Sequence, residues 1–296
     1  MEELSFRETP ELKDPYMVMG LGGWLNAAEV STGAVQYLVR TLKAQPLAEI
    51  DPEEFYDFSA LRPVATIEEG VLKSLEFISN KFYYWKNEQG DHDLIFFLGM
   101  EPNLHWHHYA DLLLEVMERF GVKRVYTVGG FYDAVPHTRQ TRITGSASPP
   151  NLKKELKAFN LEFRTGSYRG PTGIIALLRQ ACLERNIEII GLSGRSPYYV
   201  KTTNPKVCYT LLLKLTAMLG LDVDLESARM AGEYLDEMVD RALGQNADLR
   251  QYVETLEKAY DAPETTPQLP PEPSEKIIRE VEEFLRQERQ GNEGKP

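Results

Sequence analysis

The chain has 296 residues, 42% hydrophobic and 26% charged, which is enough to bury a sizeable core in an ordinary globular protein. The net charge is −12, and residues 222–296 carry most of it, with 19 Asp/Glu against 9 Lys/Arg. A nucleic-acid partner is not expected, because phosphate binding needs a basic surface. The sequence holds no run of 18 apolar residues, so no membrane partner is expected, and the acidic N-terminal stretch lacks a signal pattern, which predicts a cytoplasmic location.

The first half of the chain alternates predicted strands and helices. A strand over 16–21 leads into a glycine corner, and Asn26 is placed to cap a helix that runs to about residue 42. Residues 47–90 contain short alternating runs rich in aromatic residues, which predict an antiparallel insertion or a hairpin beside the main sheet. Strands over 94–98 and 125–128 then flank a helix over about 107–120.

The second half continues the alternation and then becomes helical. Short elements over 141–165 precede a helix to residue 184 with Pro171 at its first position, a buried strand over 187–192 and a helix over 205–219. This pattern predicts an α/β domain over 1–220, with three layers and a mostly parallel, phosphorylase-like sheet. We expect a helical extension over 221–260 packed on the domain, a Pro-rich linker over 261–273, and a tail helix over 274–290. The tail helix either folds back on the body or binds a partner.

Five loops should gather at one edge of the sheet, because ligands of open α/β sheets bind outside the carboxyl ends of the parallel strands. Each loop contains an aromatic residue, which indicates either a pocket or protein interface, or the filled edge of the core. The five loops are residues 22–26, 99–106, 129–139, 167–173 and 193–204.

Several motifs within these loops point only weakly to chemistry. The glycine corner at 20–25 has Leu25 where a dinucleotide fingerprint needs glycine, and Glu101 with His105, His107 and His108 matches no standard zinc spacing. We therefore expect no cofactor and no metal. His137 and Arg139 suit either an anionic ligand or a subunit interface, and the helix start at 170–173 exposes N–H groups that suit an anion.

Taken together, the motifs resemble the proteasome assembly chaperone 2 family, in its bacterial and archaeal branch, which is sometimes labelled ATP-grasp-like. The resemblance covers about residues 15–245. It is carried by Gly22-Gly23 with Asn26, Asp57-Phe58 with Arg62-Pro63, Phe97-x-Gly99-x-Glu101-Pro102 with Trp106, Gly129-Gly130, Val135-Pro136-His137-Thr138-Arg139, Gly145-Ser146, Gly170-Pro171-x-Gly173 and Pro197-Tyr198. It implies a three-layer α/β domain of the nucleoside-phosphorylase type, often assembled as a trimer, and eukaryotic and archaeal relatives assist proteasome assembly.

Two functions follow as hypotheses. The first is a non-enzymatic, homo-oligomeric scaffold or assembly-chaperone-like protein, with a trimer favoured and other proteins as further partners. The alternative is a nucleotide- or nucleoside-binding enzyme, of a phosphorylase, hydrolase or ATP-dependent ligase type, which uses the loops at the sheet edge. In either case the ligand or interface residues are expected to be Gly22, Gly23, Asn26, Glu101, Trp106, Gly129, Gly130, His137, Thr138, Arg139, Gly170 and Gly173.

Overall fold

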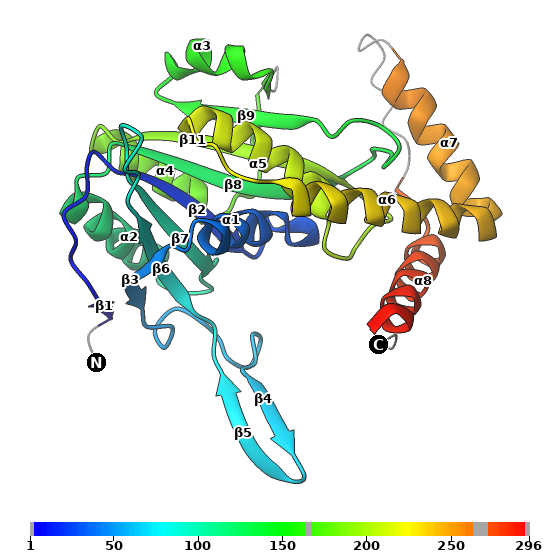
Figure 1. The fold of residues 1–296 in the computed structure, drawn as a ribbon, viewed down its shortest axis with the longest axis horizontal. Helices are drawn as coiled ribbons and strands as arrows, with labels where there is room; N and C mark the ends of the chain where they lie inside the picture. The colour runs from blue at the N-terminus through cyan, green and yellow to red at the C-terminus, as the bar shows by residue number, and fades with distance from the viewer. Residues whose placement is uncertain (1–2, 164–166, 263–271, 294–296) are drawn as a thin grey trace.

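A nine-stranded sheet forms the centre of the molecule in the computed structural model, which describes residues 3–163, 167–262 and 272–293 (Figure 1). The spatial order of the strands is β1-β3-β6-β7-β2-β8-β11-β9-β10. Their bounds are β1 (Leu4–Phe6), β2 (Tyr16–Gly22), β3 (Gln45–Ile50), β6 (Asn80–Trp85), β7 (Leu94–Met100), β8 (Arg124–Asp133), β9 (Ile143–Ser148), β10 (Glu162–Phe163) and β11 (Glu188–Pro197).

The sheet is mixed, with a parallel centre. Strands β7, β2, β8 and β11 are parallel to one another, whereas β1, β3 and β6 pair antiparallel on one side and β9 pairs antiparallel with β11 on the other. The prediction of a mostly parallel sheet is therefore right for the centre and wrong for the edges. Parallel neighbours need a crossover, usually a helix, and no helix lies between β3 and β6 or between β8 and β9.

Helices cover both faces of the sheet, so the three-layer prediction is confirmed. Met17 and Met19 of β2 pack in the core under α2 (Trp106–Phe120) and α4 (Ile174–Glu184). Val18, which points the other way, packs under α1 (Val30–Thr41) and α5 (Pro205–Leu219). This alternation follows from the two-residue period of a strand. The short helices η1 (Ala27–Glu29), α3 (Leu152–Leu156) and η2 (Lys157–Phe159) complete the body.

A third core joins the C-terminal helices to the body. It contains residues of α6 (Glu226–Gln245), α7 (Ala247–Asp261) and α8 (Glu275–Glu293), packed around Tyr199 and Val200. Val281 and Leu285 of α8 are buried there, so the tail helix docks on its own chain. The Ser274 hydroxyl accepts the Ile277 N–H, as expected of a cap. Most of the predicted linker, residues 263–271, lies outside the described residues.

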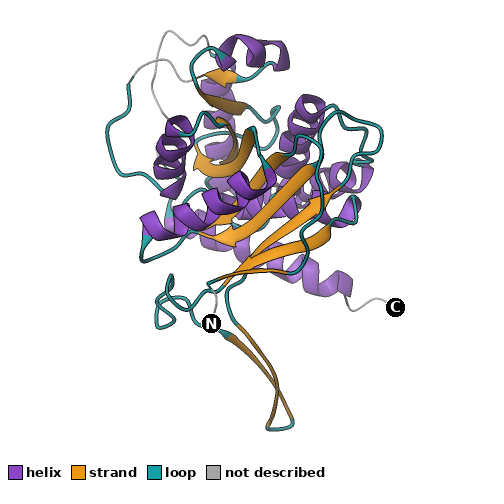
Figure 2. Cartoon of the chain, turned by 90° about the vertical axis from the view of Figure 1, so that its left-hand side faces the viewer, coloured by secondary structure: helices purple, strands orange, loops and turns teal. Residues whose placement is uncertain are grey.

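A β-hairpin projects from the body, as Figures 1 and 2 show. It consists of β4 (Val64–Glu68) and β5 (Val71–Glu76), which pair only with each other. The predicted insertion thus divides: β3 and β6 join the main sheet, and the hairpin between them does not. Asn80 fixes the base of this hairpin, because its buried side-chain oxygen accepts the Met100 N–H and the hydroxyl protons of Tyr56 and Tyr109.

None of the described helices is long and apolar enough to cross a membrane.

Candidate functional site

The predicted loops do meet at one edge of the sheet, although their bounds differ from the prediction. Strands β8 and β11 pair in parallel over ten residues each, so Gly129 and Gly130 belong to β8 rather than to a loop. Strand β10 runs antiparallel to the central strands, and loop 167–173 reaches the carboxyl edge at the start of α4. Helix α4 begins at Ile174, which leaves Pro171 outside it.

Glu101 connects three of these segments. One of its carboxylate oxygens accepts the Ile174 N–H at 2.7 Å, and the other accepts the Trp24 N–H at 3.2 Å. A Cβ on Gly173 would run into the first oxygen, and a Cβ on Gly23, where φ is +106°, would lie 2.8 Å from the Glu101 Cβ. Glycines at these positions therefore let the carboxylate cap the start of α4, where the helix dipole favours a negative charge.

Asn26, Gly129 and Gly130 form a second junction next to the first. The Asn26 side-chain oxygen accepts the N–H groups of Ser31 and Thr32, so it caps the first turn of α1 as expected. Asn26 also pairs with Gly130 as an isolated β-bridge. A Cβ on Gly130 would lie 2.7 Å from the Val30 Cβ, so this glycine allows α1 to approach β8 closely.

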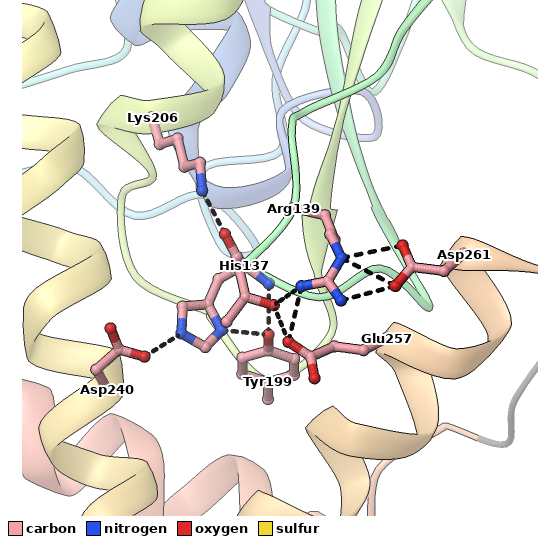
Figure 3. A network of polar contacts seen from close by, with 8 residues as sticks. His137, Arg139, Tyr199, Lys206, Asp240, Glu257 and Asp261 are labelled. Carbon is pink, nitrogen blue, oxygen red and sulfur yellow. Dashed lines mark hydrogen bonds and ion pairs between the residues drawn. The ribbon is translucent and has the colours of Figure 1, made fainter.

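The buried His137 lies in a polar network that joins the body to α6 at Asp240, whose side chain is 62% exposed (Figure 3). The Tyr199 hydroxyl lies 2.7 Å from both the His137 backbone N and its Nδ1, and Asp240 lies 3.1 Å from Nε2. Since the hydroxyl accepts the backbone N–H, its own proton goes to Nδ1, which leaves the imidazole proton on Nε2 for Asp240. Burial lowers the pKa of His137, and the Asp240 carboxylate acts against that shift. The neutral imidazole is therefore the form that this network holds.

Thr138 and Arg139 bind the next helix of the extension, α7. The Arg139 guanidinium donates to both oxygens of Asp261, at 2.7 to 3.2 Å, and to Glu257 at 3.0 Å, and the Thr138 hydroxyl also donates to Glu257 (Figure 3). Hydrogen bonding to Arg139 lowers the pKa of Asp261. The charges of this loop are thus neutralised by the chain's own helix, in a fork geometry that suits arginine and carboxylate.

The space beside this network is small. Its walls include Val135, Arg142, Arg195 and Asp236, and the enclosed volume of about 20 Å³ is room for roughly one water molecule. Lys206, also in the wall, donates to the His137 carbonyl and to Asp236 at 2.6 Å. A nucleoside does not fit here unless α6 and α7 move away.

The remaining predicted residues have structural surroundings. Trp106 opens α2, packs partly buried against the core and donates its indole N–H to the Pro102 carbonyl at 2.8 Å. Gly22 faces the Met100 sulfur, and Gly170 lies under the Tyr168 hydroxyl. Among the described residues, no three His, Cys, Asp or Glu side chains group closely enough to hold a metal ion. His108 instead contacts Glu3, with 2.6 Å between Nε2 and Oε2.

Three large apolar side chains are exposed on the loops that meet around Glu101. Trp24 is 60% exposed, Leu104 48% and Tyr168 69%. Trp24 binds Glu101 through its backbone, Leu104 follows Glu101 by three residues, and the Tyr168 hydroxyl donates to Pro171 beside the start of α4. We refer to Trp24, Leu104 and Tyr168 as the edge patch. Exposed aromatic residues of this kind anchor protein interfaces.

Acidic pairs in the C-terminal helices are the sequence signal for the partners of His137 and Arg139. Asp236 with Asp240, and Glu257 with Asp261, each lie four residues apart and therefore on one face of a helix. Two acidic pairs on consecutive helices can supply the hydrogen-bond acceptors that the histidine and the arginine of a His-x-Arg loop need. Tyr199, by contrast, has no local signal, because it approaches His137 from 62 residues away.

Comparison with known proteins agrees with this fold. The family model described as the PAC2 family matches residues 20–243. The chain is 28% identical to a PAC2 family protein from Streptomyces avermitilis, with a TM-score of 0.72, covering 81% of this chain and 100% of that one. It is likewise 28% identical, with a TM-score of 0.72, to the Mycobacterium tuberculosis proteasome-assembly chaperone homologue Rv2125, covering 80% of this chain and 99% of that one. The fold is also shared with Pyrococcus furiosus PbaB, an archaeal proteasome activator, at 23% identity and a TM-score of 0.67, over 81% of this chain and 99% of that one.

Since the family model spans the parallel centre of the sheet, the Glu101 junction and helix α6, the chain belongs to the PAC2 family, in agreement with the resemblance found in its sequence.

Proposed function

We propose that this chain is a non-enzymatic, assembly-chaperone-like or scaffold protein that acts in the cytoplasm as a homo-oligomer, with a trimer favoured. It binds proteins through the carboxyl edge of its sheet, first its own copies and then the subunits of a larger assembly. The relative from M. tuberculosis is described as a proteasome-assembly chaperone homologue, which makes proteasome subunits the first partner class to test.

The edge patch is the observation that carries this proposal. Trp24, Leu104 and Tyr168 are each about half exposed or more, and all belong to loops around Glu101. Exposed apolar side chains on loops that Glu101 connects are suited to a protein surface more than to a small polar ligand.

The polar residues at the same edge do not favour the enzymatic alternative. An anionic ligand at Arg139 has to displace both Glu257 and Asp261, and His137 is buried with both ring nitrogens occupied. A nucleotide site at this position therefore needs the C-terminal helices to leave the body.

An assembly reaction tests the proposal. The α- and β-type proteasome subunits of the same cell are mixed at low concentration, with the full-length protein, with a Trp24→Ser/Tyr168→Ser variant, or with neither. We expect the wild-type protein to speed the appearance of complete particles on native gels and the variant to lose most of that effect. Equal rates in all three reactions contradict the proposal. Thermal stabilisation of the wild-type protein by a nucleoside or nucleotide, absent in Arg139→Gln, favours the enzymatic alternative instead.

A further inference from the structure

Arg179, on α4, is a half-buried arginine whose hydrogen-bond partners are all neutral. Its guanidinium donates to two hydroxyls of β9, from Nη2 to Ser146 Oγ at 2.9 Å and from Nη1 to Ser148 Oγ at 3.4 Å. Among residues 3–163, 167–262 and 272–293, no carboxylate forms an ion pair with it. Because arginine stays protonated in proteins, the described chain leaves this positive charge without an anion.

Other arginines of the body have acidic partners. Arg124, whose side chain is 14% exposed, pairs with Glu188 at 2.6 Å. Arg185, at the end of α4, pairs with Glu118 at 2.9 Å. Burial lowers the pKa of Arg179, because the charged guanidinium has lost part of its hydration. The fold therefore partly desolvates Arg179 without giving it the carboxylate that it gives to these other arginines.

The guanidinium of Arg179 lies over a glycine of the sheet. Gly191 of β11 pairs with Thr127 of β8 on one side and with Ser146 of β9 on the other. A Cβ on Gly191 would lie 2.5 Å from Ser146 Oγ. It would also lie 3.2 Å from both Arg179 Nη2 and Thr127 Oγ1. Glycine at this position therefore lets one guanidinium and hydroxyls from two strands come together above the sheet.

This group has more hydrogen-bond donors than the described contacts use. A guanidinium has five N–H donors, and Ser146 and Ser148 accept two of them. Each serine hydroxyl accepts from Arg179, so its own proton can go to another acceptor. Ser146 is exposed, which makes the group accessible from solvent. A planar guanidinium with hydroxyl donors beside it suits an oxyanion, which can accept from both.

The position of this group separates it from the edge patch. Gly191 lies near the start of β11, which runs from Glu188 to Pro197, whereas the carboxyl edge of the sheet follows Pro197. A ligand held by Arg179 therefore requires neither Glu101 nor the exposed side chains around it.

We propose that Arg179, Ser146 and Ser148 form a binding site for a phosphate-type oxyanion, either the free ion or the phosphate group of a larger molecule. The guanidinium supplies the positive charge and N–H donors, and the serine hydroxyls donate from β9. Phosphate suits donors on two different elements, because its oxygens point in several directions. The inference goes beyond the proposed function and does not depend on it.

Calorimetric titration of the full-length protein with inorganic phosphate, at an ionic strength held constant with sodium chloride, tests this site. We expect saturable binding of one phosphate per chain. Arg179→Gln should weaken the affinity about tenfold or more, because the amide loses the charge and the fork of donors. Ser146→Ala should weaken it by a smaller factor, since one neutral donor is lost. Methyl phosphate, titrated in parallel, binds more tightly than inorganic phosphate if the site takes a phosphate ester, and more weakly if it takes the free ion.

Arg185→Gln is the matched control, because Arg185 lies at the end of the same helix and is already paired with Glu118. It should bind phosphate as the wild type does. Circular dichroism shows whether Arg179→Gln is folded, and Ser146→Ala tests the site at an exposed position in any case. The inference is overturned if the wild type shows no saturable binding, or if Arg179→Gln and Ser146→Ala bind as tightly as the wild type. Equal weakening by Arg185→Gln also overturns it, because phosphate then responds only to net charge. None of these outcomes affects the edge patch, which the assembly reaction tests separately.

Discussion

Removing the Glu101 carboxylate is expected to destabilise the protein far more than removing any exposed glutamate. In Glu101→Ala, the N–H groups of Ile174 and Trp24 lose a charged acceptor. A hydrogen bond to a charged group contributes about 1.5–3 kcal/mol. Of the two bonds, that to Ile174 is the shorter and part-buried, whereas Trp24 is exposed enough for water to replace the acceptor. We therefore expect a loss of about 2–4 kcal/mol in the free energy of unfolding.

Glu101→Gln sharpens this expectation, because the amide keeps one acceptor oxygen and loses the charge. Its loss in the free energy of unfolding should be about half that of Glu101→Ala. Urea unfolding followed by circular dichroism gives the free energies, and tryptophan fluorescence checks that the transition is two-state. Hydrogen exchange should show faster exchange of the Ile174 amide in Glu101→Ala.

Glu115→Ala is the control, since Glu115 is exposed on α2. If Glu101→Ala unfolds within about 0.5 kcal/mol of Glu115→Ala, the carboxylate is not a structural cap. It would then be free to bind a ligand, and Glu101 would not be what holds the three segments together.

Three further predictions concern other parts of the molecule. Gly173→Ala should push the Glu101 carboxylate off the Ile174 N–H and lower the free energy of unfolding in urea by about 1–2 kcal/mol. In a Glu101→Ala background the same substitution should lower it little further, because the two changes break the same hydrogen bond. Additive losses would contradict this. Since burial lowers the pKa of His137, the unfolded chain takes up its proton first, so stability should fall as the pH drops below about 6.5. The difference between the pH–stability curves of the wild type and His137→Asn measures this slope, and parallel curves would exclude it. Leu285→Asp places a charge in the third core and should release α8 from the body. Limited trypsin digestion should then cut first after Arg279 and Arg286, while the melting temperature of the body stays nearly unchanged. Unchanged digestion would mean that α8 stays docked.

The sequence predicted the parallel centre of the sheet because buried parallel strands have a strong local signal. The apolar runs at 94–98 and 125–128 mark β7 and β8 well, but the strand ends were placed too early. Gly129 and Gly130 looked like a loop because glycine is a weak strand former. They remain in the ladder because β11 pairs with β8 along its whole length and α1 needs the space at Gly130.

The edges of the sheet and the partners of the polar loop depend on contacts that are distant in sequence. Nothing local shows that β9 runs antiparallel to β11, or that His137 meets Asp240 across 103 residues. The prediction therefore placed His137 and Arg139 at the correct edge but left open whether they face a ligand or a subunit. In the structure His137 and Arg139 contact neither a ligand nor a second subunit but the chain's own C-terminal helices.

The β4–β5 hairpin, residues 64–76, is held at its base by residues that lie outside it. Asn80, Tyr56 and Tyr109, which fix its base, all lie outside residues 64–76, and so does Phe58, which contacts Phe77 edge-on with 5.1 Å between ring centroids. Substitutions within residues 64–76 are therefore expected to leave the folding of the body almost unaffected. The hairpin should also accept insertions that a strand of the nine-stranded sheet would not, because β4 and β5 pair only with each other.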